Sequence, residues 1–459
     1  MKSYKFFKKN INKIYFYLLI PPFIYILIYN LLYYDPILGY DAEAHYSYID
    51  SLSRYLPRRF RIPNASETRE FFNPPLAYVF PSFVQVICRN FSKAENLLIS
   101  CKPVYGKFSQ IFQTLMFIFS TYINLLTLKH LTNKNKEFYI VSYMLLVLLL
   151  AVNYRTISMI RGEPYILFFL SILIYKFVKL ENNNFCFARL DFLKFGILIG
   201  GLALSRQWAF LLFPPLFLVT IFIDKESRKG YFINIFKSFF IGFLISGWFY
   251  INNYLKYGSL IAFNIDRTKI NYFLEIKKIF SLENILEYLF TNPIRPNFNN
   301  QFFPILYSDT WGDYWGYFVF TSRYLEVGYN QLVVGQYLGR VNILSSFTTL
   351  IMLFGFIYKN SSNKNPITIS LLKIFVLFSF LGYLWFVISF PTTTGDTIKA
   401  TYTVQMLNVL IILGSILIEN VKNKKIYFIV IVVLTFICIH NFSSFLSKFP
   451  LGFPNLITN

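Results

Sequence analysis

Charged residues are scarce in this chain, and so are residues that commonly bind metals. Only 14% of the 459 residues are Asp, Glu, Lys or Arg, and there are three histidines and four cysteines. Soluble domains carry about 25% charged residues, so a water-soluble globular protein is excluded. No Cys-x-x-Cys or Cys/His spacing is present, so neither a zinc site nor a disulfide framework is expected. The cysteines are Cys88, Cys101, Cys186 and Cys438.

Nucleotide-binding motifs are also missing. The chain has no Walker A sequence and no Gly-x-Gly-x-x-Gly after a predicted strand, the motifs that hold nucleotide phosphates. Their absence argues against an ATPase and against a soluble nucleotide-sugar domain. No internal repeat is visible either, which weakens a transporter built from duplicated halves.

Long apolar runs dominate the sequence instead. Hydrophobic residues make up 55% of the chain, and the mean hydropathy is +0.48. Because a helix needs about 20 apolar residues to cross a bilayer, the runs predict an all-α polytopic membrane protein with about ten or eleven spans. The predicted spans are residues 14–34, 104–128, 138–154, 165–180, 194–205, 207–223, 232–251, 341–358, 368–390, 401–418 and 426–446.

The net charge of +22 is carried by basic residues in the short loops between these runs. If residues 75–92 do not span, every basic cluster falls on one side, which the positive-inside rule makes cytoplasmic. This interpretation needs no nucleic acid as a partner, and it allows attraction to anionic membrane lipids. The clusters are Lys2/Lys5/Lys8/Lys9/Lys13, Lys129/Lys134/Lys136, Lys176/Lys179/Arg189/Lys194, Lys225/Arg228/Lys229, Lys359/Lys364 and Lys422/Lys424/Lys425.

The predicted organisation has three parts. Residues 1–251 form an N-terminal transmembrane module whose first outer loop, residues 35–103, carries the chemistry. Residues 252–340 form a long loop region on the periplasmic or lumenal side, and residues 341–459 hold the C-terminal transmembrane helices. The short turn from Arg155 to Pro164 faces the same outer side.

The most informative motif follows the first span and reads Tyr40-Asp41-Ala42-Glu43-Ala44-His45. Asp41 and His45 are four residues apart, so they share one face of a short surface helix that Pro57 ends. A carboxylate there could act as a general base. The alternative is structural: Asp41 caps the helix, and His45 rests at the membrane interface.

Other polar motifs fall at predicted membrane boundaries. Arg161 and Glu163 lie between two spans, Arg206 precedes Trp208, and Lys399 opens a span. Arg206 and Lys399 could bind phosphate, or they could anchor the helices at the interface. Arg161 and Glu163 could equally be a capping pair. The segment Glu70-Phe71-Phe72-Asn73-Pro74-Pro75-Leu76-Ala77-Tyr78 could be a simple turn at the membrane surface.

Aromatic and acidic residues cluster in the long outer region, at Asp309-Thr310-Trp311-Gly312-Asp313-Tyr314-Trp315. Sugar rings stack well on aromatic faces, so Trp311 and Asp313 are candidates for sugar binding. The alternative is an aromatic patch that rests on the membrane interface.

In their order along the chain, these motifs resemble the GT-C superfamily of membrane glycosyltransferases. The nearest similarity is to the bacterial branch related to protein O-mannosyltransferases and lipid A aminoarabinose transferases. The resemblance implies a GT-C-like helix bundle with juxtamembrane helices and a long loop on the outer side. It also implies a polyprenyl-phosphate sugar donor, a lipid, glycan or protein acceptor, and a single inverting displacement. The site would lie on the periplasmic side of a bacterial inner membrane.

The resemblance also implies roles for individual residues. Asp41 matches the acid that activates the acceptor, and Glu163 falls where relatives place a second acid. Many relatives carry Asp-Glu in the first motif, whereas Ala42 follows Asp41 here, so no role is expected for Glu43. No cofactor is expected, although relatives differ in metal dependence and a divalent metal stays open. The expected substrate-binding residues are His45, Tyr78, Arg161, Arg206, Lys399, Tyr402, Trp311 and Asp313.

Two other functions stay open at this point. A transporter or flippase for lipid-linked glycans would share the many spans, and a glycan polymerase would share the large outer loop. Transporters place ionisable groups at mid-membrane. Here charged residues concentrate at the outer ends of the spans, which favours chemistry at the membrane surface.

Overall fold

The computed structural model describes residues 2–36, 38–56, 58–91, 97–132, 138–261, 263, 272–319, 329–358, 364–421 and 423–447. Throughout these residues the chain forms helices and no β-strand, so the predicted all-α class is confirmed. Some residues used for the sequence predictions lie outside the described part: Pro57, Lys134, Lys136, Lys359 and Lys422.

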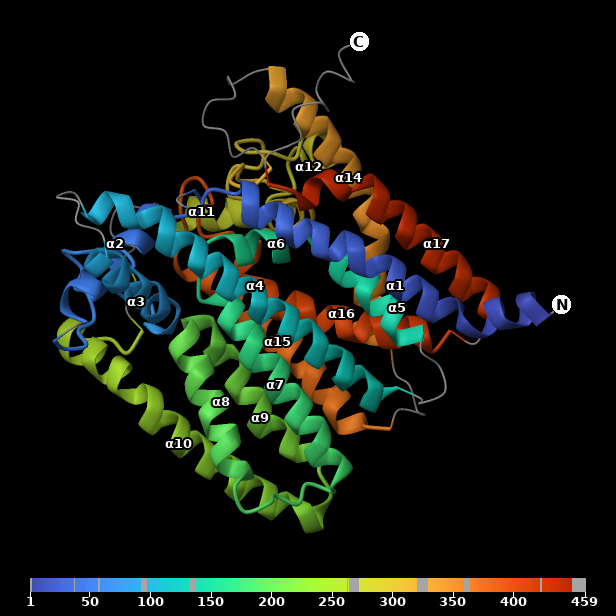
Figure 1. Ribbon diagram of the computed structural model, residues 1–459, viewed down its shortest axis with the longest axis horizontal. Helices are drawn as coiled ribbons and strands as arrows, with labels where there is room; N and C mark the ends of the chain where they lie inside the picture. Colours follow the sequence, from blue (N-terminus) through green and yellow to red (C-terminus); the bar gives the residue numbers. More distant parts are fainter. Residues whose placement is uncertain are drawn as a thin grey trace.

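The helices are numbered along the chain (Figure 1). The α-helices are α1 (Lys2–Tyr33), α2 (Ala42–Tyr55), α3 (Leu76–Phe91), α4 (Leu97–Leu131), α5 (Phe138–Leu149), α6 (Ala151–Ser158), α7 (Glu163–Asn182), α8 (Asp191–Ser205), α9 (Phe213–Leu218), α10 (Lys225–Tyr257), α11 (Tyr272–Ile279), α12 (Ile285–Tyr288), α13 (Phe302–Trp311), α14 (Tyr329–Ile357), α15 (Pro366–Ser389), α16 (Val404–Glu419) and α17 (Lys424–His440). Short 3-10 helices are η1 (Gln207–Leu212), η2 (Val219–Phe222), η4 (Ala400–Thr403) and η5 (Phe442–Phe445).

Six helices of the described chain are long and apolar enough to cross a membrane, so the protein is a multi-pass membrane protein. They are α1, α4, α10, α14, α15 and the helix formed by η4 with α16. A seventh span arises if α5 and α6, which meet at a bend of 62°, count as one. Each of these coincides with a predicted span. The segment predicted not to span forms α3 (Leu76–Phe91), which is not among the candidate spans.

The other predicted spans also form helices, but these helices are short, broken or charged. α8 has 15 residues and α17 has 17, which gives lengths of about 22 and 26 Å against a hydrocarbon core of about 30 Å. Residues 207–222 are divided among η1, α9 and η2. α7 carries Lys176, Lys179 and Glu181 in its last two turns.

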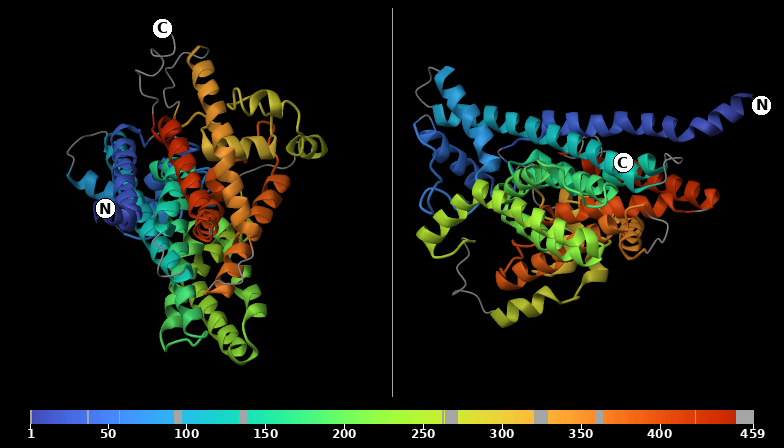
Figure 2. Two further views of the ribbon diagram at one scale, coloured as in Figure 1. Left: turned by 90° about the vertical axis from the view of Figure 1, so that its right-hand side faces the viewer. Right: turned by 90° about the horizontal axis from the view of Figure 1, so that it is seen from below.

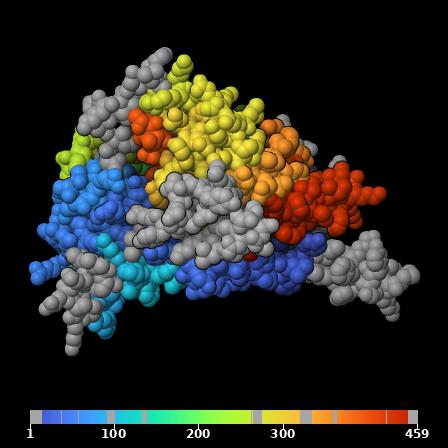
Figure 3. Space-filling model, turned by 90° about the horizontal axis from the view of Figure 1, so that it is seen from above, coloured from blue at the N-terminus to red at the C-terminus, as the bar shows by residue number. Residues whose placement is uncertain are grey.

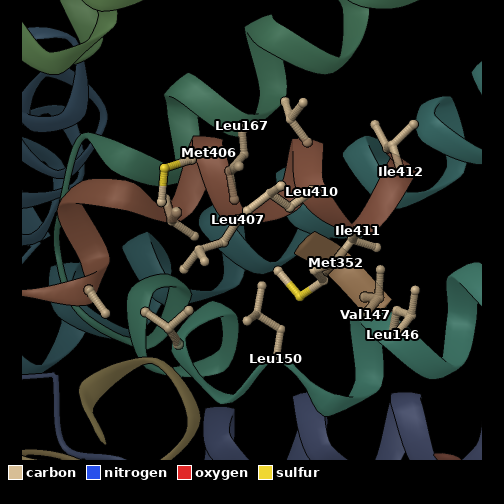
Figure 4. Packing of buried hydrophobic residues seen from close by; sticks show 14 of the residues in the cluster. Leu146, Val147, Leu150, Leu167, Met352, Met406, Leu407, Leu410, Ile411 and Ile412 are labelled. Atoms are coloured by element: carbon tan, nitrogen blue, oxygen red, sulfur yellow. The ribbon is translucent and has the colours of Figure 1, made fainter. Parts of the chain in front are cut away.

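α16 is the central helix of the bundle. It packs against α5, α7, α14 and α15, and 89% of its apolar window is buried. Figure 4 shows Leu407, Leu410 and Ile411 of this helix close to Leu150, at the bend between α5 and α6, and to Met352 of α14. A spanning helix surrounded by protein on every side must be apolar all round, which explains its nearly continuous apolar sequence.

Gly355 allows α14 to approach α16 closely. A Cβ atom at this position would lie 2.6 Å from the backbone nitrogen of Gly414, which is too close for any side chain. We therefore expect Gly355→Ala to destabilise the fold by about 1–3 kcal/mol, because helix backbones must move apart. The control is Gly230→Ala on α10, where an added Cβ meets no atom within 4 Å and helix propensity improves by up to about 1 kcal/mol. Thermal unfolding in detergent measures both; equal midpoints would contradict the close contact.

The helices α2 and α3 lie at the end of α1 that is opposite to the N-terminus (Figure 1). Both views of Figure 2 show α1 along the edge of the bundle. Residues 272–319, which contain α11, α12 and α13, form part of the surface in Figure 3, beside α14. Within residues 272–319, the long predicted loop region therefore contains helices as well as turns.

α1 is joined to the last described residues of the chain. The Asn30 side chain donates a hydrogen bond to the Phe445 carbonyl (2.9 Å) and accepts one from the Ser447 backbone N–H (2.7 Å). Asn30 is buried, so the pair of bonds satisfies an amide that would otherwise be costly in an apolar setting.

The prediction that the cysteines form no disulfide framework was wrong. Cys88 of α3 and Cys101 of α4 form a disulfide, with Cα atoms 6.1 Å apart. The two residues are 13 positions apart, with no motif spacing between them, so the helix pairing of α3 with α4 and not a local pattern brings them together. Cys186 is free and exposed, and Cys438 is free and buried.

The disulfide predicts a specific labelling pattern. Under denaturing conditions without reductant, we expect a maleimide reagent to modify Cys186 and Cys438 only, and all four cysteines after reduction. Cys101→Ser should release one further thiol at Cys88 and lower the free energy of unfolding by about 2–4 kcal/mol. Mass spectrometry counts the labels, and four labels without reductant would show that no disulfide forms.

Candidate active site

A polar cavity of about 210 Å³ lies where distant segments of the chain meet. These are the start of α2, the loop that follows α2, the junction of α8 with η1, and the loop between α15 and η4. Aromatic rings, including those of Trp208 and Tyr402, form part of the wall. The charged lining residues are Asp41, Glu70, Asp396, Arg69, Arg206 and Lys399.

Asp41 occupies the N-cap position of α2 but does not cap it. Its backbone is left-handed (φ 53°), and its side chain makes no capping hydrogen bond. The carboxylate instead accepts a hydrogen bond from Lys399 Nζ at 2.8 Å, and Arg69 Nη2 lies 4.0 Å away. The capping alternative for Asp41 is therefore wrong, and two residues separated by 358 positions form one ion pair.

The Asp41–Lys399 pair determines the protonation of the carboxyl group. Burial favours the neutral form, but the charge and hydrogen bond of Lys399 outweigh burial and hold the pKa of Asp41 well below its ordinary value. The carboxylate is thus ionised at neutral pH.

Lys399 is fixed by aromatic neighbours. Its backbone N–H donates to the Tyr383 hydroxyl at 2.7 Å. Its ammonium lies 5.1 Å from the ring centre of Tyr40 and 5.8 Å from that of Tyr402, distances at which a cation is attracted to an aromatic ring. The ammonium is therefore held beside Asp41, in the wall of the cavity.

Arg206 pairs with two buried carboxylates. Its Nε lies 3.2 Å from Glu163 Oε1 and its Nη1 lies 3.6 Å from Glu70 Oε2. Gly162 makes the first contact possible, since a Cβ there would lie 2.1 Å from the Ser205 carbonyl oxygen. Arg206 Nη1 faces Glu70 Oε2 but makes no hydrogen bond to a described residue.

Glu70 is a lining residue that the sequence did not single out. It is buried, and burial raises its pKa although the Arg206 charge opposes this. Asn73 donates a short hydrogen bond to Glu70 and a second, of 3.2 Å, to the Tyr78 hydroxyl. A network of polar groups therefore extends from the cavity into the protein.

His45 and Tyr78 belong to that network. His45 Nδ1 lies 2.7 Å from the Tyr78 hydroxyl, and the Tyr78 ring stacks on that of Tyr48. Burial, with the nearby arginines Arg161 and Arg206, lowers the pKa of His45 well below its ordinary value, so the imidazole is neutral at pH 7. His45 and Tyr78 lie behind the cavity wall and support it.

Arg161 lies behind Tyr40. Its Nη2 donates to the Tyr40 carbonyl at 3.0 Å, and its guanidinium lies 4.9 Å from the Tyr40 ring centre. It is fully buried and does not line the cavity. Its contacts therefore position the residue that precedes Asp41.

Trp311 and Asp313 lie away from the polar cavity. The Asp313 carboxylate accepts hydrogen bonds from the backbone N–H groups of Phe318 and Val319, both at 2.8 Å. It also lies 3.6 Å from Arg155 Nη1. Arg155 belongs to α6, so the segment predicted as a turn between Arg155 and Pro164 begins as a buried helix.

Trp311 lines a second, apolar cavity of about 520 Å³. This cavity lies among α13, α14, α15 and α16, with Phe303, Met352, Phe380 and Leu407 in its wall. Almost every lining side chain is apolar, so the space suits hydrocarbon and not a sugar.

No group of three or more His, Cys, Asp or Glu side chains that could hold a metal ion occurs among the described residues. In the polar cavity, carboxylates lie close to lysine and arginine side chains. Such a mixture can hold a phosphate next to a carboxylate and shield both from water.

No known protein family, no curated protein and no solved structure matches this chain.

Proposed function

We propose that this protein is a membrane glycosyltransferase of the GT-C type that takes its sugar from a polyprenyl-phosphate donor. One observation carries the proposal: the cavity places an ionised carboxylate, Asp41, next to cations that suit a phosphate, Lys399 and Arg206. Sugar transfer from a lipid phosphate to a hydroxyl requires a carboxylate to accept the proton and, next to it, cations to bind the phosphate.

The chemistry is a single displacement. The acceptor hydroxyl oxygen bonds to the anomeric carbon while the bond from that carbon to the phosphate oxygen breaks. The electron pair goes to the departing lipid phosphate, and the hydroxyl proton goes to the Asp41 carboxylate. Lys399 and Arg206 stabilise the negative charge on the phosphate, and Trp208 and Tyr402 offer rings for the sugar. Glu163 holds Arg206 in place.

The apolar cavity supports a lipid-linked donor. It lies beside α13 and between membrane-spanning helices, where one or two isoprene units could be buried. Each buried methylene stabilises a bound lipid by about 0.8 kcal/mol. We therefore assign the polar head of the donor to the polar cavity and part of its chain to the apolar one.

The disulfide supports the proposed orientation. Disulfides persist in oxidising compartments and are rare in the cytosol, and Cys88 and Cys101 both lie in the predicted first outer loop, residues 35–103. The basic clusters independently assign the N-terminus to the cytoplasm. Both arguments give a site on the outer side of the cell membrane.

The experiment uses purified protein in detergent with a panel of labelled polyprenyl-phosphate sugars. We expect release of lipid phosphate from at least one donor, faster with an added hydroxyl acceptor. The same protein in liposomes is tested for movement of the donor between leaflets. Donor movement without release would reject the transferase and favour a flippase.

A further inference from the structure

Asp309 connects the two segments that carry the Asp41–Lys399 pair. It lies on α13 and is fully buried. Its Oδ1 accepts a hydrogen bond from the Tyr40 hydroxyl at 3.0 Å, and its Oδ2 accepts one from the Ala400 backbone N–H at 2.7 Å. Tyr40 directly precedes Asp41, and Ala400 directly follows Lys399. One carboxylate therefore fixes both neighbours of the ion pair.

Arg155 holds Asp309 in place. The ion pair between Arg155 Nη2 and Asp309 Oδ1 measures 3.0 Å, and Arg155 Nη1 donates to the Gly312 carbonyl at 2.7 Å. Because both side chains are at most 1% exposed, water does not compete for these bonds. The carboxylate is thus anchored to α6 as well as to α13.

Asp309 adds to the contacts that Arg161 and Tyr383 make with the same two segments. α2 begins without a side-chain cap, and Asp41 itself has left-handed backbone geometry, which residues with a side chain adopt much less often than glycine, although aspartate tolerates it better than most. Such a conformation persists only when the surroundings hold it. The Tyr40–Asp309 hydrogen bond is one of the contacts that do so.

We propose that Asp309 is a positioning residue: through Tyr40 and Ala400 it sets the geometry of the Asp41–Lys399 pair without touching substrate. This rests on the proposed role of Asp41 as the base. Asp309 does not line the polar cavity, so its effect on turnover must pass through the pair.

Asp313 provides a matched control. It lies four residues further on, is equally buried and contacts the same Arg155. Its carboxylate accepts hydrogen bonds from the backbone of residues 317–319 and makes none to Tyr40 or Ala400. A purely structural role for the Arg155 cluster would make Asp309 and Asp313 equivalent.

The pKa of Asp41 reports on the pair. The charged and titratable groups around Asp41 are Lys399, Arg161 and His45, with Arg69 and Glu70 in the cavity wall. Burial and Glu70 favour its neutral form, whereas Lys399 favours the carboxylate. A looser Lys399 contact therefore moves the pKa of Asp41 upward.

The test measures that pKa in Tyr40→Phe, Asp309→Asn and Asp313→Asn. Tyr40→Phe removes only the hydroxyl and keeps the ring that Lys399 and Arg161 contact. Infrared titration of protein labelled with ¹³C-aspartate, with the Asp41→Asn spectrum subtracted, follows the Asp41 carboxylate directly. We expect it to stay ionised to pH 3 in the wild type and in Asp313→Asn. In Tyr40→Phe and Asp309→Asn we expect half-protonation near the ordinary aspartate value of about 3.9.

A second measurement follows turnover. The pH below which kcat/KM falls should shift together with the pKa of Asp41 measured by infrared titration. We expect this shift in Tyr40→Phe and Asp309→Asn, but not in Asp313→Asn. An unchanged Asp41 pKa in Tyr40→Phe and Asp309→Asn, or an equal shift in Asp313→Asn, would overturn the proposal. If Asp309→Asn does not fold, Tyr40→Phe decides. A wild type without turnover rejects the transferase, while the infrared titration still decides whether Asp309 positions the pair.

Discussion

Asp41→Asn is expected to lower kcat for sugar transfer by about 10²- to 10⁴-fold, the range for loss of a general base. An amide of the same shape cannot accept the hydroxyl proton. It keeps an oxygen that can still accept the Lys399 hydrogen bond, which measures 2.8 Å in the wild type. The protein should therefore fold, insert and bind donor. The measurement is release of labelled lipid phosphate at saturating donor.

Glu43→Gln is the matched control for this variant. Glu43 lies two residues further on in α2, is exposed and does not line the polar cavity. Its neutralisation removes a charge of the same sign close to the start of the same helix. The rate of lipid-phosphate release should stay within about twofold of the wild-type rate, because exposed charges have small effects. Equal rates for wild type and Asp41→Asn would remove Asp41 from the mechanism.

The pH dependence of release tests the same assignment. Because the pKa of Asp41 is lowered, the carboxylate persists as the pH falls, and activity is lost only below the ordinary aspartate range. An anionic donor beside Lys399 offsets part of the ammonium charge and raises the pKa of Asp41 in the complex. The acid limb of kcat should therefore lie at a higher pH than that of kcat/KM. His45, held neutral, should add no limb near pH 6.5.

Arg206→Met is expected to destabilise the protein by about 3–5 kcal/mol, the cost of leaving buried charge without its partner. Glu163 and Glu70 are almost fully buried, and both pair with this guanidinium. The loss should appear as a lower thermal midpoint in detergent and as a weaker affinity for donor phosphate. Surviving protein should need a higher donor concentration for half-maximal release.

The double variant Arg206→Met/Glu163→Gln separates the two effects. Neutralising Glu163 should recover part of the lost stability, because the effects of mutations at two contacting residues are not additive. Donor affinity should stay low because no guanidinium is restored. Arg54→Met, at an exposed position of α2, is the control for loss of one arginine. A midpoint for Arg206→Met equal to that of Arg54→Met would contradict the buried pairing.

The sequence predicted the helical class and the positions of the six helices that could cross a membrane and of the bent pair α5 and α6, because long apolar runs are typical of helices in a bilayer. It also predicted four further spans, where the helices are short, broken or charged. The short helix after the first span was predicted from the spacing of Asp41 and His45, and it is α2. The bend between α5 and α6, and the division of residues 207–222, could not be predicted. Both depend on how neighbouring helices pack, which a single apolar run does not encode.

The partners of the candidate site residues were beyond sequence reasoning. Asp41 and Lys399 lie 358 positions apart, and no spacing rule relates residues on different helices. Glu70 looked like part of a turn before Asn73, and only the fold turns it towards Arg206. Trp311 and Asp313 looked like one aromatic and acidic patch. In the structure one faces apolar side chains and the other binds backbone.

The hydrogen bonds of the Asn30 side chain can form only late in the synthesis of the chain. α1 leaves the ribosome long before the partners of Asn30, because Phe445 and Ser447 are translated more than 400 residues later. For most of translation this amide must rely on lipid headgroups or water. α1 packs against α4, α5 and α6 as well, so only the hydrogen bonds of this one amide wait for the residues that follow α17.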